Sequence, residues 1–99
     1  MHVTFEFDSA VIPYAGMGAW HFASLPKSRT AQIRAQMIQR PKAFGSIRVE
    51  AKIGKTVWKT SIFPDTKSGT YLLPVKADVR KKESIRMQKV KIQLKLIES

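Results

Sequence analysis

Apolar and polar residues alternate along several short stretches of the chain. In residues 3–8 the apolar positions are Val3, Phe5 and Phe7, and the side chains between them are polar. Residues 89–96 show the cleanest alternation, with four aliphatic side chains among three lysines and one glutamine. A period of two places all the apolar side chains on one face of an extended strand. Each stretch therefore predicts a half-buried β-strand.

The middle of the chain predicts a β-hairpin. Isoleucine, valine and alanine alternate with charged residues over residues 47–53. Gly54 and Lys55 follow, and a two-residue loop that begins with glycine suits a type II′ turn. Residues 56–63 are therefore expected to pair antiparallel with the preceding strand, with Trp58 on the inner face.

Two further strands are expected, one on each side of this hairpin. One covers residues 19–25, with Trp20 and Phe22 on a shared face, and the other covers residues 70–73 and ends at Pro74. In a small barrel, inward aromatic side chains normally fill the interior and leave no cavity. We therefore expect six aromatic residues to pack as core, with Phe63, at a strand end, the candidate for the barrel mouth: Trp20, Phe22, Phe44, Trp58, Phe63 and Tyr71.

The apolar period changes to that of a helix over residues 27–39. Ile33 and Met37 lie four residues apart, and Ala31 and Ala35 are compatible with the same stripe. This helix is expected to cover the core with its narrow apolar side. It should end at the proline that follows, because the residue before a proline is pushed out of the helical region.

Turn-forming residues separate the predicted elements. The Gly16-Met17-Gly18 stretch predicts a turn after the first strand, and residues 64–69 predict a loop. Residues 77–83 are rich in lysine and arginine and predict one or two helical turns.

The element count predicts the fold class. About six short strands in 99 residues leave exposed edges unless the sheet closes on itself. We therefore predict a mainly β fold: a small closed or partly split antiparallel β-barrel with one or two short helices at its ends. It should form a single domain over residues 1–99. An open β-sandwich is the alternative.

Composition narrows the chemistry. The chain has no cysteine, which excludes disulfides, thiolate metal sites and cysteine nucleophiles. Eighteen basic and seven acidic residues give a net charge of +11, and every lysine and arginine lies after residue 26. Such a surplus is typical of a protein that binds phosphate backbones, although it also suits a solvated surface. No apolar run is long enough to span a membrane, so a cytoplasmic location is expected.

Three basic residues form a candidate anion site: Lys76, Arg80 and Lys81. Lys76 and Arg80 are four residues apart, and a helix that starts near the preceding proline stacks them on one face. A phosphate or carboxylate then becomes a candidate ligand. In the alternative, Asp78 and Glu83 pair with these cations at the surface and contribute little to stability.

The sequence contains no recognisable catalytic or metal-binding motif. His21 stands between two aromatic residues, with Ser24 and Ser61 as conceivable partners, but the chain lacks a G-x-S-x-G elbow. Glu6 and Asp8 share a strand face without a neighbour that would separate their pKa values. No catalytic residue, metal site or cofactor is predicted.

Four blocks of the sequence resemble one bacterial family. They are residues 20–26 (WHFASLP), 44–47 (FGSI), 58–64 (WKTSIFP) and 69–81 (GTYLLPVKADVRK). Together they resemble the domain of unknown function DUF1905, which occurs alone or fused to a YdeI/OmpD-associated segment. The resemblance implies a compact all-β barrel without an established activity or catalytic residues. The chain departs from it at Met87-Gln88-Lys89, where the family usually has a Gly-Asp turn.

Three functions follow as hypotheses. The first is a non-catalytic binding or interaction module with an unknown ligand. The second is a nucleic-acid or polyanion binder that uses the basic surface. The third is a pocket for an anionic small molecule at the barrel mouth, with Lys76 and Arg80 facing the anion.

Overall fold

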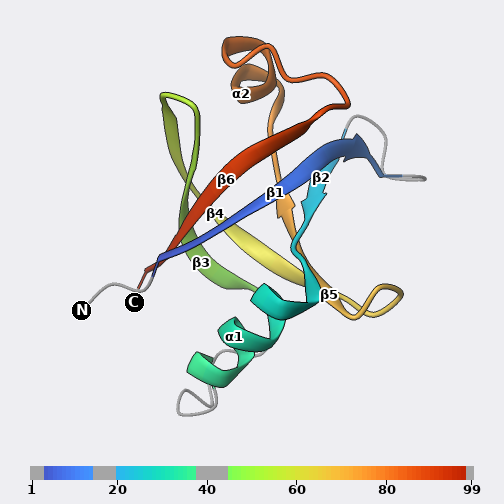
Figure 1. The fold of residues 1–99 in the computed structure, drawn as a ribbon, viewed down its shortest axis with the longest axis vertical. Helices are drawn as coiled ribbons and strands as arrows, with labels where there is room; N and C mark the ends of the chain where they lie inside the picture. Colours follow the sequence, from blue (N-terminus) through green and yellow to red (C-terminus); the bar gives the residue numbers. More distant parts are fainter. Residues whose placement is uncertain (1–3, 15–19, 38–44, 98–99) are drawn as a thin grey trace.

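The structure, a computed structural model, describes residues 4–14, 20–37 and 45–97. These residues form six strands, β1 (Thr4–Pro13), β2 (His21–Ser24), β3 (Ile47–Ile53), β4 (Thr56–Asp65), β5 (Thr70–Pro74) and β6 (Lys89–Leu96), and two helices, α1 (Lys27–Met37) and α2 (Ala77–Lys82). The strands close into a barrel in the order β1-β2-β5-β4-β3-β6, with every pairing antiparallel (Figure 1). The predicted mainly β barrel with two short helices is confirmed. Neither helix in these residues is long and apolar enough to cross a membrane.

Alternating side chains fill the barrel interior as the clearest patterns predict. Val49 and Ala51 on β3 and Ile92 and Leu94 on β6 have no exposed surface. Ile62 on β4 is equally buried. Burying one such aliphatic side chain stabilises the fold by about 1.5–3 kcal/mol. The hairpin and the last strand therefore supply much of the core.

β1 continues past the predicted end at Asp8 to Pro13. Its first seven residues pair with β6 and its last three with β2, so one strand links both parts of the barrel wall. Val11 is buried and continues the inward alternation, but Ser9 interrupts the apolar pattern in the sequence. The Ser9 hydroxyl donates to the backbone carbonyl of Ser24 at 2.9 Å. Because Ser9 breaks the apolar alternation, the sequence pattern did not reveal that the strand continues to Pro13.

β2 presents the opposite face to the one predicted. Ala23 and Leu25 are buried in the core, whereas Phe22 packs outside it and Trp20 is 55% exposed. Successive side chains of a strand point to opposite faces. If the wrong alternate residues are assigned to the core, the predicted direction of every side chain in the strand is reversed. The expectation that Trp20 and Phe22 fill the barrel is therefore wrong.

β4 extends two residues beyond its predicted end. Pro64 and Asp65 still pair with β5, so the predicted loop begins only after Asp65. Pro64 fits here because its nitrogen faces the β3 side, and the β3–β4 register ends earlier, at Ile47 and Ile62. No ladder hydrogen bond is lost. The predicted turn at residues 16–18, and also Val3, Ile38, Gln39 and Phe44, lie outside the described residues.

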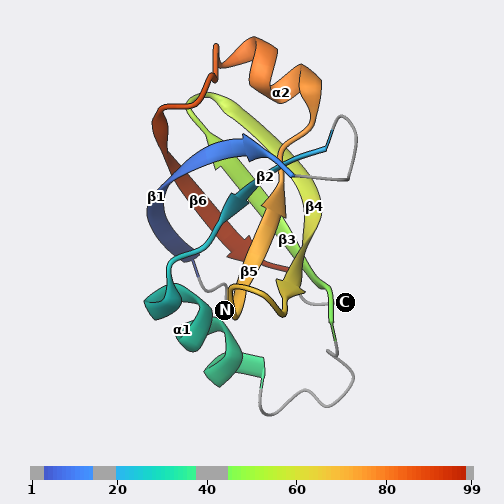
Figure 2. The same ribbon diagram turned by 90° about the vertical axis from the view of Figure 1, so that its right-hand side faces the viewer.

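The two helices lie at opposite ends of the barrel (Figures 1 and 2). On α1 the buried residues are Thr30 and Ile33, with Met37 packed against the core. Ala31 and Ala35 are exposed, so the predicted stripe is wrong in these two positions. The Thr30 hydroxyl accepts a hydrogen bond from a backbone amide of β5 at 3.2 Å, which explains why a polar residue occupies this buried position.

At the other end, α2 is tied to the tip of the β3–β4 hairpin. Glu83, which follows α2, accepts hydrogen bonds from the Lys55 amide at 3.3 Å and from the Thr56 hydroxyl at 2.6 Å. Gly54 has a φ of +59°, as the first residue of a type II′ turn requires. A Cβ atom at Gly54 would overlap the Glu83 carboxylate. Glycine is therefore needed here for conformation and for space.

Replacing Gly54 with alanine tests this double requirement. Gly54→Ala should lower the free energy of unfolding, measured by urea denaturation, by about 1–2 kcal/mol from the positive φ alone. It should lose about 1 kcal/mol more, because the methyl group displaces the Glu83 carboxylate from its two donors.

Gly69→Ala is the matched control. Gly69 also has a positive φ, of +72°, but a Cβ there meets no atom within 4 Å. In a Glu83→Ala background the costs of the two glycine substitutions should become equal. Equal costs in the unmodified background would contradict the proposed collision.

Candidate functional site

The pairing between β4 and β5 ends part-way along the two strands. Its last pair is Phe63 with Leu72, although β5 extends to Pro74. Backbone groups of a strand point alternately to its two neighbours. The Val75 amide donates to the His21 carbonyl on β2, so the nitrogen of Pro74 faces β4. Proline has no N–H to donate, and the ladder stops there.

A pocket of about 490 Å³ occupies the resulting seam between β4 and β5. Lys59 and Thr60 of β4 line one side, and residues 74–77 line the other. Trp58, which is buried, lines it from the barrel interior, and the exposed Trp20 lines it from outside. Trp58 and Tyr71 pack in the core as expected, and the hollow lies in the barrel wall rather than in the interior. We call this site the seam pocket.

The charged side chains that line the seam pocket are cations. Lys59 and Lys76 are exposed, and Arg80 is half-buried. Among the described lining residues there is no aspartate or glutamate. The pocket therefore combines apolar walls with an electrostatic preference for an anion.

Arg80 is held in place at the pocket by two contacts. Its Nε donates to the Val75 carbonyl at 3.2 Å, and one terminal nitrogen lies 3.3 Å from Nε2 of His21. A guanidinium has only donors, so Nε2 of His21 is the acceptor in this contact. The two contacts hold the planar Arg80 group against β2 and against the residue that follows β5.

The structure brings two of the three predicted anion-site residues together. Lys76 and Arg80 both line the seam pocket, whereas Lys81 is exposed and is not part of its lining. Lys76 precedes α2 in an extended conformation, so the two are not stacked on a helix as predicted. Among the described residues, Asp78 bonds to a backbone amide of α2 and Glu83 to the hairpin. Neither forms the surface pairing considered as the alternative.

Sequence reasoning missed the contribution of Lys59 and Trp20. Lys59 is an exposed residue of β4, on the opposite face to Trp58, and its alternation gives no sign of a pocket. The signal for the pocket was Pro74, a proline in a strand that has a partner on each side. Proline has no N–H to donate to a neighbouring strand. Because β5 lies between two strands, a break in the pairing on one side is expected at Pro74.

A second hollow, of about 400 Å³, lies beside the first. Trp20 stacks on Phe22 with ring centroids 5.9 Å apart and an interplanar angle of 12°, and Tyr14 meets Phe22 edge-on at 5.3 Å. Phe63, which is 42% exposed, and Leu72 also line this hollow. Trp20 thus borders both hollows and is supported by aromatic contacts outside the barrel.

A family model for the Domain of unknown function (DUF1905) matches residues 7–94. The chain belongs to this family. The matched range includes every residue that lines the seam pocket. The description of DUF1905 states no activity, and a search of curated proteins finds no match to the chain. Within the described residues of this DUF1905 member, no group of three or more His, Asp or Glu side chains has the arrangement of a metal site.

Asp65 anchors the aromatic contacts in this DUF1905 member. Its carboxylate accepts hydrogen bonds from the Ser68 hydroxyl at 2.8 Å, the Ser68 amide at 3.3 Å and the Tyr14 hydroxyl at 3.3 Å. These donors, with the Ser68 hydroxyl the largest contributor, lower the pKa of Asp65 below its ordinary value of 3.8. The carboxylate therefore connects the end of β1 to the turn between β4 and β5.

The lowered pKa of Asp65 predicts a pH-dependent contribution to stability. The folded state binds the proton less readily than the unfolded state, so the ionised carboxylate stabilises the fold above its ordinary pKa of 3.8. This contribution is lost as the pH falls through the lower folded value. Asp65→Asn should therefore have a slightly lower Tm than the wild type at pH 7, and the difference should vanish at the acidic end.

Melting curves between pH 7 and pH 2.5 check this expectation. An NMR titration of Ser68→Ala provides the control, because removal of the largest donor should raise the pKa of Asp65 toward its ordinary value. A constant difference in Tm across the whole pH range would argue against the assignment.

Proposed function

We propose that this DUF1905 domain is a binding module that holds a small organic anion in the seam pocket. One observation carries the proposal: apolar walls and three cationic side chains, Lys59, Lys76 and Arg80, line the same hollow without a carboxylate among the described lining residues. Its volume of about 490 Å³ falls in the range of pockets that hold small molecules. The supported ligand has an apolar body and one negative group.

The two parts of the lining would contribute differently to binding. Trp20, Trp58 and Val75 offer apolar surface, and covering such surface is favourable in proportion to its area. Lys59 and Lys76 are exposed, so solvent and salt weaken their attraction for an anion. The apolar contacts therefore supply most of the affinity, and the cations select the sign of the ligand's charge.

The lining supports binding rather than turnover. Nε2 of His21 lies 3.3 Å from a terminal nitrogen of Arg80, so in this arrangement it faces the guanidinium rather than a hydroxyl. Activation of a hydroxyl requires a base within hydrogen-bond reach of it. The first hypothesis from the sequence, a non-catalytic module, is thus combined with the third, an anion pocket.

Binding of 2-naphthoate tests the proposal. The two tryptophans of the chain both line the seam pocket, so ligand binding should change the intrinsic fluorescence. Lys59→Ala combined with Lys76→Ala should weaken binding roughly tenfold, which corresponds to about 1.4 kcal/mol for two exposed cations. The neutral analogue 2-naphthamide should bind with similarly reduced affinity, and the double variant should not change that affinity.

Lys81→Ala combined with Lys82→Ala is the charge-matched control. Both residues are exposed on α2 and neither lines the pocket, so naphthoate binding should be nearly unchanged. An equal loss in the two double variants would mean that only overall charge matters. Absence of naphthoate binding would contradict the proposal.

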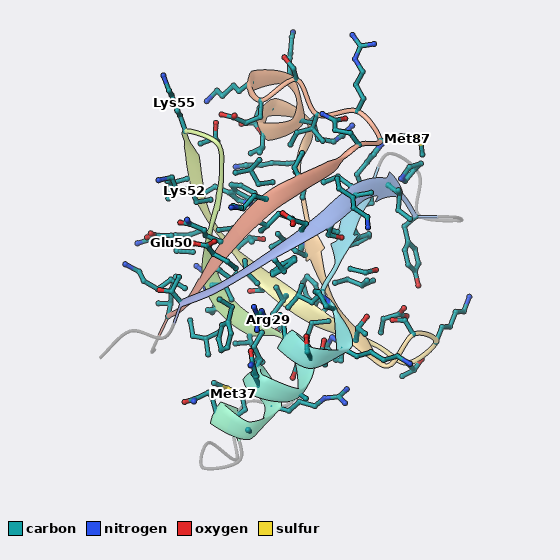
Figure 3. The ribbon with its side chains drawn as sticks, viewed as in Figure 1. Arg29, Met37, Glu50, Lys52, Lys55 and Met87 are labelled. Carbon is teal, nitrogen blue, oxygen red and sulfur yellow. The ribbon has the colours of Figure 1, made fainter. Side chains whose placement is uncertain are left out.

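A second candidate function, nucleic-acid binding, is favoured by the charge at the α2 end of the barrel. Exposed cations gather there on the hairpin tip, on α2 and on the segment that follows: Lys52, Lys55, Lys81, Lys82 and Arg86. Figure 3 labels Lys52 and Lys55 on the hairpin, and Lys55 projects away from the barrel beside α2. Such a cluster supports contacts with phosphates that do not depend on base sequence.

Fluorescence anisotropy with a single-stranded oligonucleotide tests this candidate. Binding should weaken steeply between low salt and ~200 mM salt. Lys81→Ala with Lys82→Ala should reduce the slope of log affinity against log salt by about 1.4, at ~0.7 for each lost phosphate contact. Lys27→Ala with Lys67→Ala, which removes two exposed cations from other surfaces, should leave the slope nearly unchanged. No binding at low salt would remove this candidate.

A further inference from the structure

Trp20 lies between the seam pocket and the second hollow and lines both of them. Its indole stacks on Phe22, with an interplanar angle of 12°, outside the barrel core. Trp20 is nevertheless 55% exposed, so Phe22 covers only part of the ring system and the rest faces solvent. Phe63, which is 42% exposed, also lines the second hollow. The two hollows together therefore offer exposed aromatic surface to a ligand.

Charge is divided unevenly between the two hollows. The seam pocket is lined by three cations, Lys59, Lys76 and Arg80. The second hollow has no lysine or arginine among its described lining residues, and its charged residue is Asp65, whose carboxylate is already bonded to neighbouring hydroxyls. A ligand that lies across Trp20 therefore matches the site when its negative group is in the seam pocket and a neutral aromatic group is on the indole.

The positive charge continues from the seam pocket onto α2. Arg80 lines the pocket, and Lys81 and Lys82 follow it on the same short helix with exposed side chains. Lys55, at the hairpin tip, lies beside this helix because its amide donates to Glu83. A ligand with one negative group would use the pocket alone, whereas a chain of phosphates can contact the pocket and α2 at once. The arrangement therefore fits a polyanion that carries aromatic groups.

We infer that the seam pocket and Trp20 form a binding site for single-stranded nucleic acid. This inference rests on the proposed anion pocket and identifies its anion as a phosphodiester group. One phosphate lies in the pocket, where Lys59, Lys76 and Arg80 attract it. The adjacent base stacks on the exposed part of Trp20, and neighbouring phosphates extend over the cations of α2.

Stacking on Trp20 requires that the strand be single. The bases of a duplex are paired and stacked on one another, so their faces do not reach a side chain on the protein surface. In a single strand the faces are accessible, and every base has a π-face that an aromatic side chain can cover. The site should therefore prefer single strands over duplexes and should bind them without reading their sequence.

Fluorescence anisotropy with a labelled oligothymidylate about ten nucleotides long tests the inference. Trp20→Ala should weaken binding about tenfold, because the stacked base loses its aromatic partner. It should leave the slope of log affinity against log salt unchanged, since an indole carries no charge. Lys59→Ala with Lys76→Ala should also weaken binding but should flatten the salt dependence, because contacts with phosphate are lost.

An abasic oligomer of the same length separates stacking from attraction to phosphates. It has the same backbone charge but no bases, so it should bind about tenfold more weakly than the oligothymidylate. Trp20→Ala should not weaken its binding further. In the unmodified protein, the oligothymidylate should move the ring-proton NMR signals of Trp20 upfield, whereas the abasic oligomer should not.

Val57→Ala is the matched control for the removal of an exposed apolar side chain. Val57 is 51% exposed and lines neither hollow, so oligothymidylate binding should be unchanged. Trp20→Phe retains an aromatic ring and should keep most of the affinity that Trp20→Ala loses. Trp20 lies outside the core, so both variants should have the circular-dichroism spectrum of the wild type.

The outcomes distinguish this inference from the proposed function. If 2-naphthoate binds but the oligothymidylate does not, the inference is wrong and the anion pocket stands. It is also wrong if the abasic oligomer binds as tightly as the oligothymidylate, or if either Trp20→Ala or the Lys59 and Lys76 double variant leaves oligothymidylate binding unchanged. If neither naphthoate nor the oligothymidylate binds, the anion pocket fails and the inference fails with it.

Discussion

The missing amide hydrogen of Pro74 is the constraint on which the candidate site depends. A residue with an N–H at this position could extend the β4–β5 ladder toward Ser61. Proline stops the ladder at Leu72 instead. β5 remains in place because its other edge is bonded to the β2 side, through the Val75 amide to His21 and the Leu25 amide to Tyr71. The barrel is closed, but the end of β5 is paired with β2 and lies beyond its register with β4.

The packing of the aromatic side chains keeps this break in the β4–β5 pairing from weakening the barrel. Trp58 and Tyr71 are buried in the core, and Arg34 of α1 lies over the Tyr71 ring, 5.7 Å from its centroid. Trp20 and Phe22 instead form a stack on the outer surface. The core is complete without the outer pair, because Ala23 and Leu25 provide the inward side chains at β2. The outer aromatic residues are thus available to border a ligand site.

Much of the fold could be predicted from the sequence, but only where one face of a strand carries all the apolar residues. The β3 and β6 patterns meet this condition, and both strands have their predicted ends. On β2 both faces are apolar, so alternation could not decide between Trp20 with Phe22 and Ala23 with Leu25. The site was predicted only in part for a related reason. Lys76 and Arg80 are close in sequence, whereas Lys59 reaches the same pocket only through strand pairings between distant parts of the chain.

The cations of the protein fall into two groups, one exposed on α2 and the hairpin and one beside the apolar walls of the seam pocket, and each group would attract anions in a different way. Within the described residues, the one ion pair joins Lys95 and Glu50 at 3.9 Å, and Glu50 lies opposite Lys59 in the β3–β4 register. The cations of α2 and the hairpin therefore act together as a general field, which salt screens over about 10 Å at 0.1 M. Lys76 and Arg80 differ because apolar walls fix where an anion can lie relative to them. A ligand that covers those walls keeps most of its affinity when salt is added, whereas attraction to the outer cations is lost.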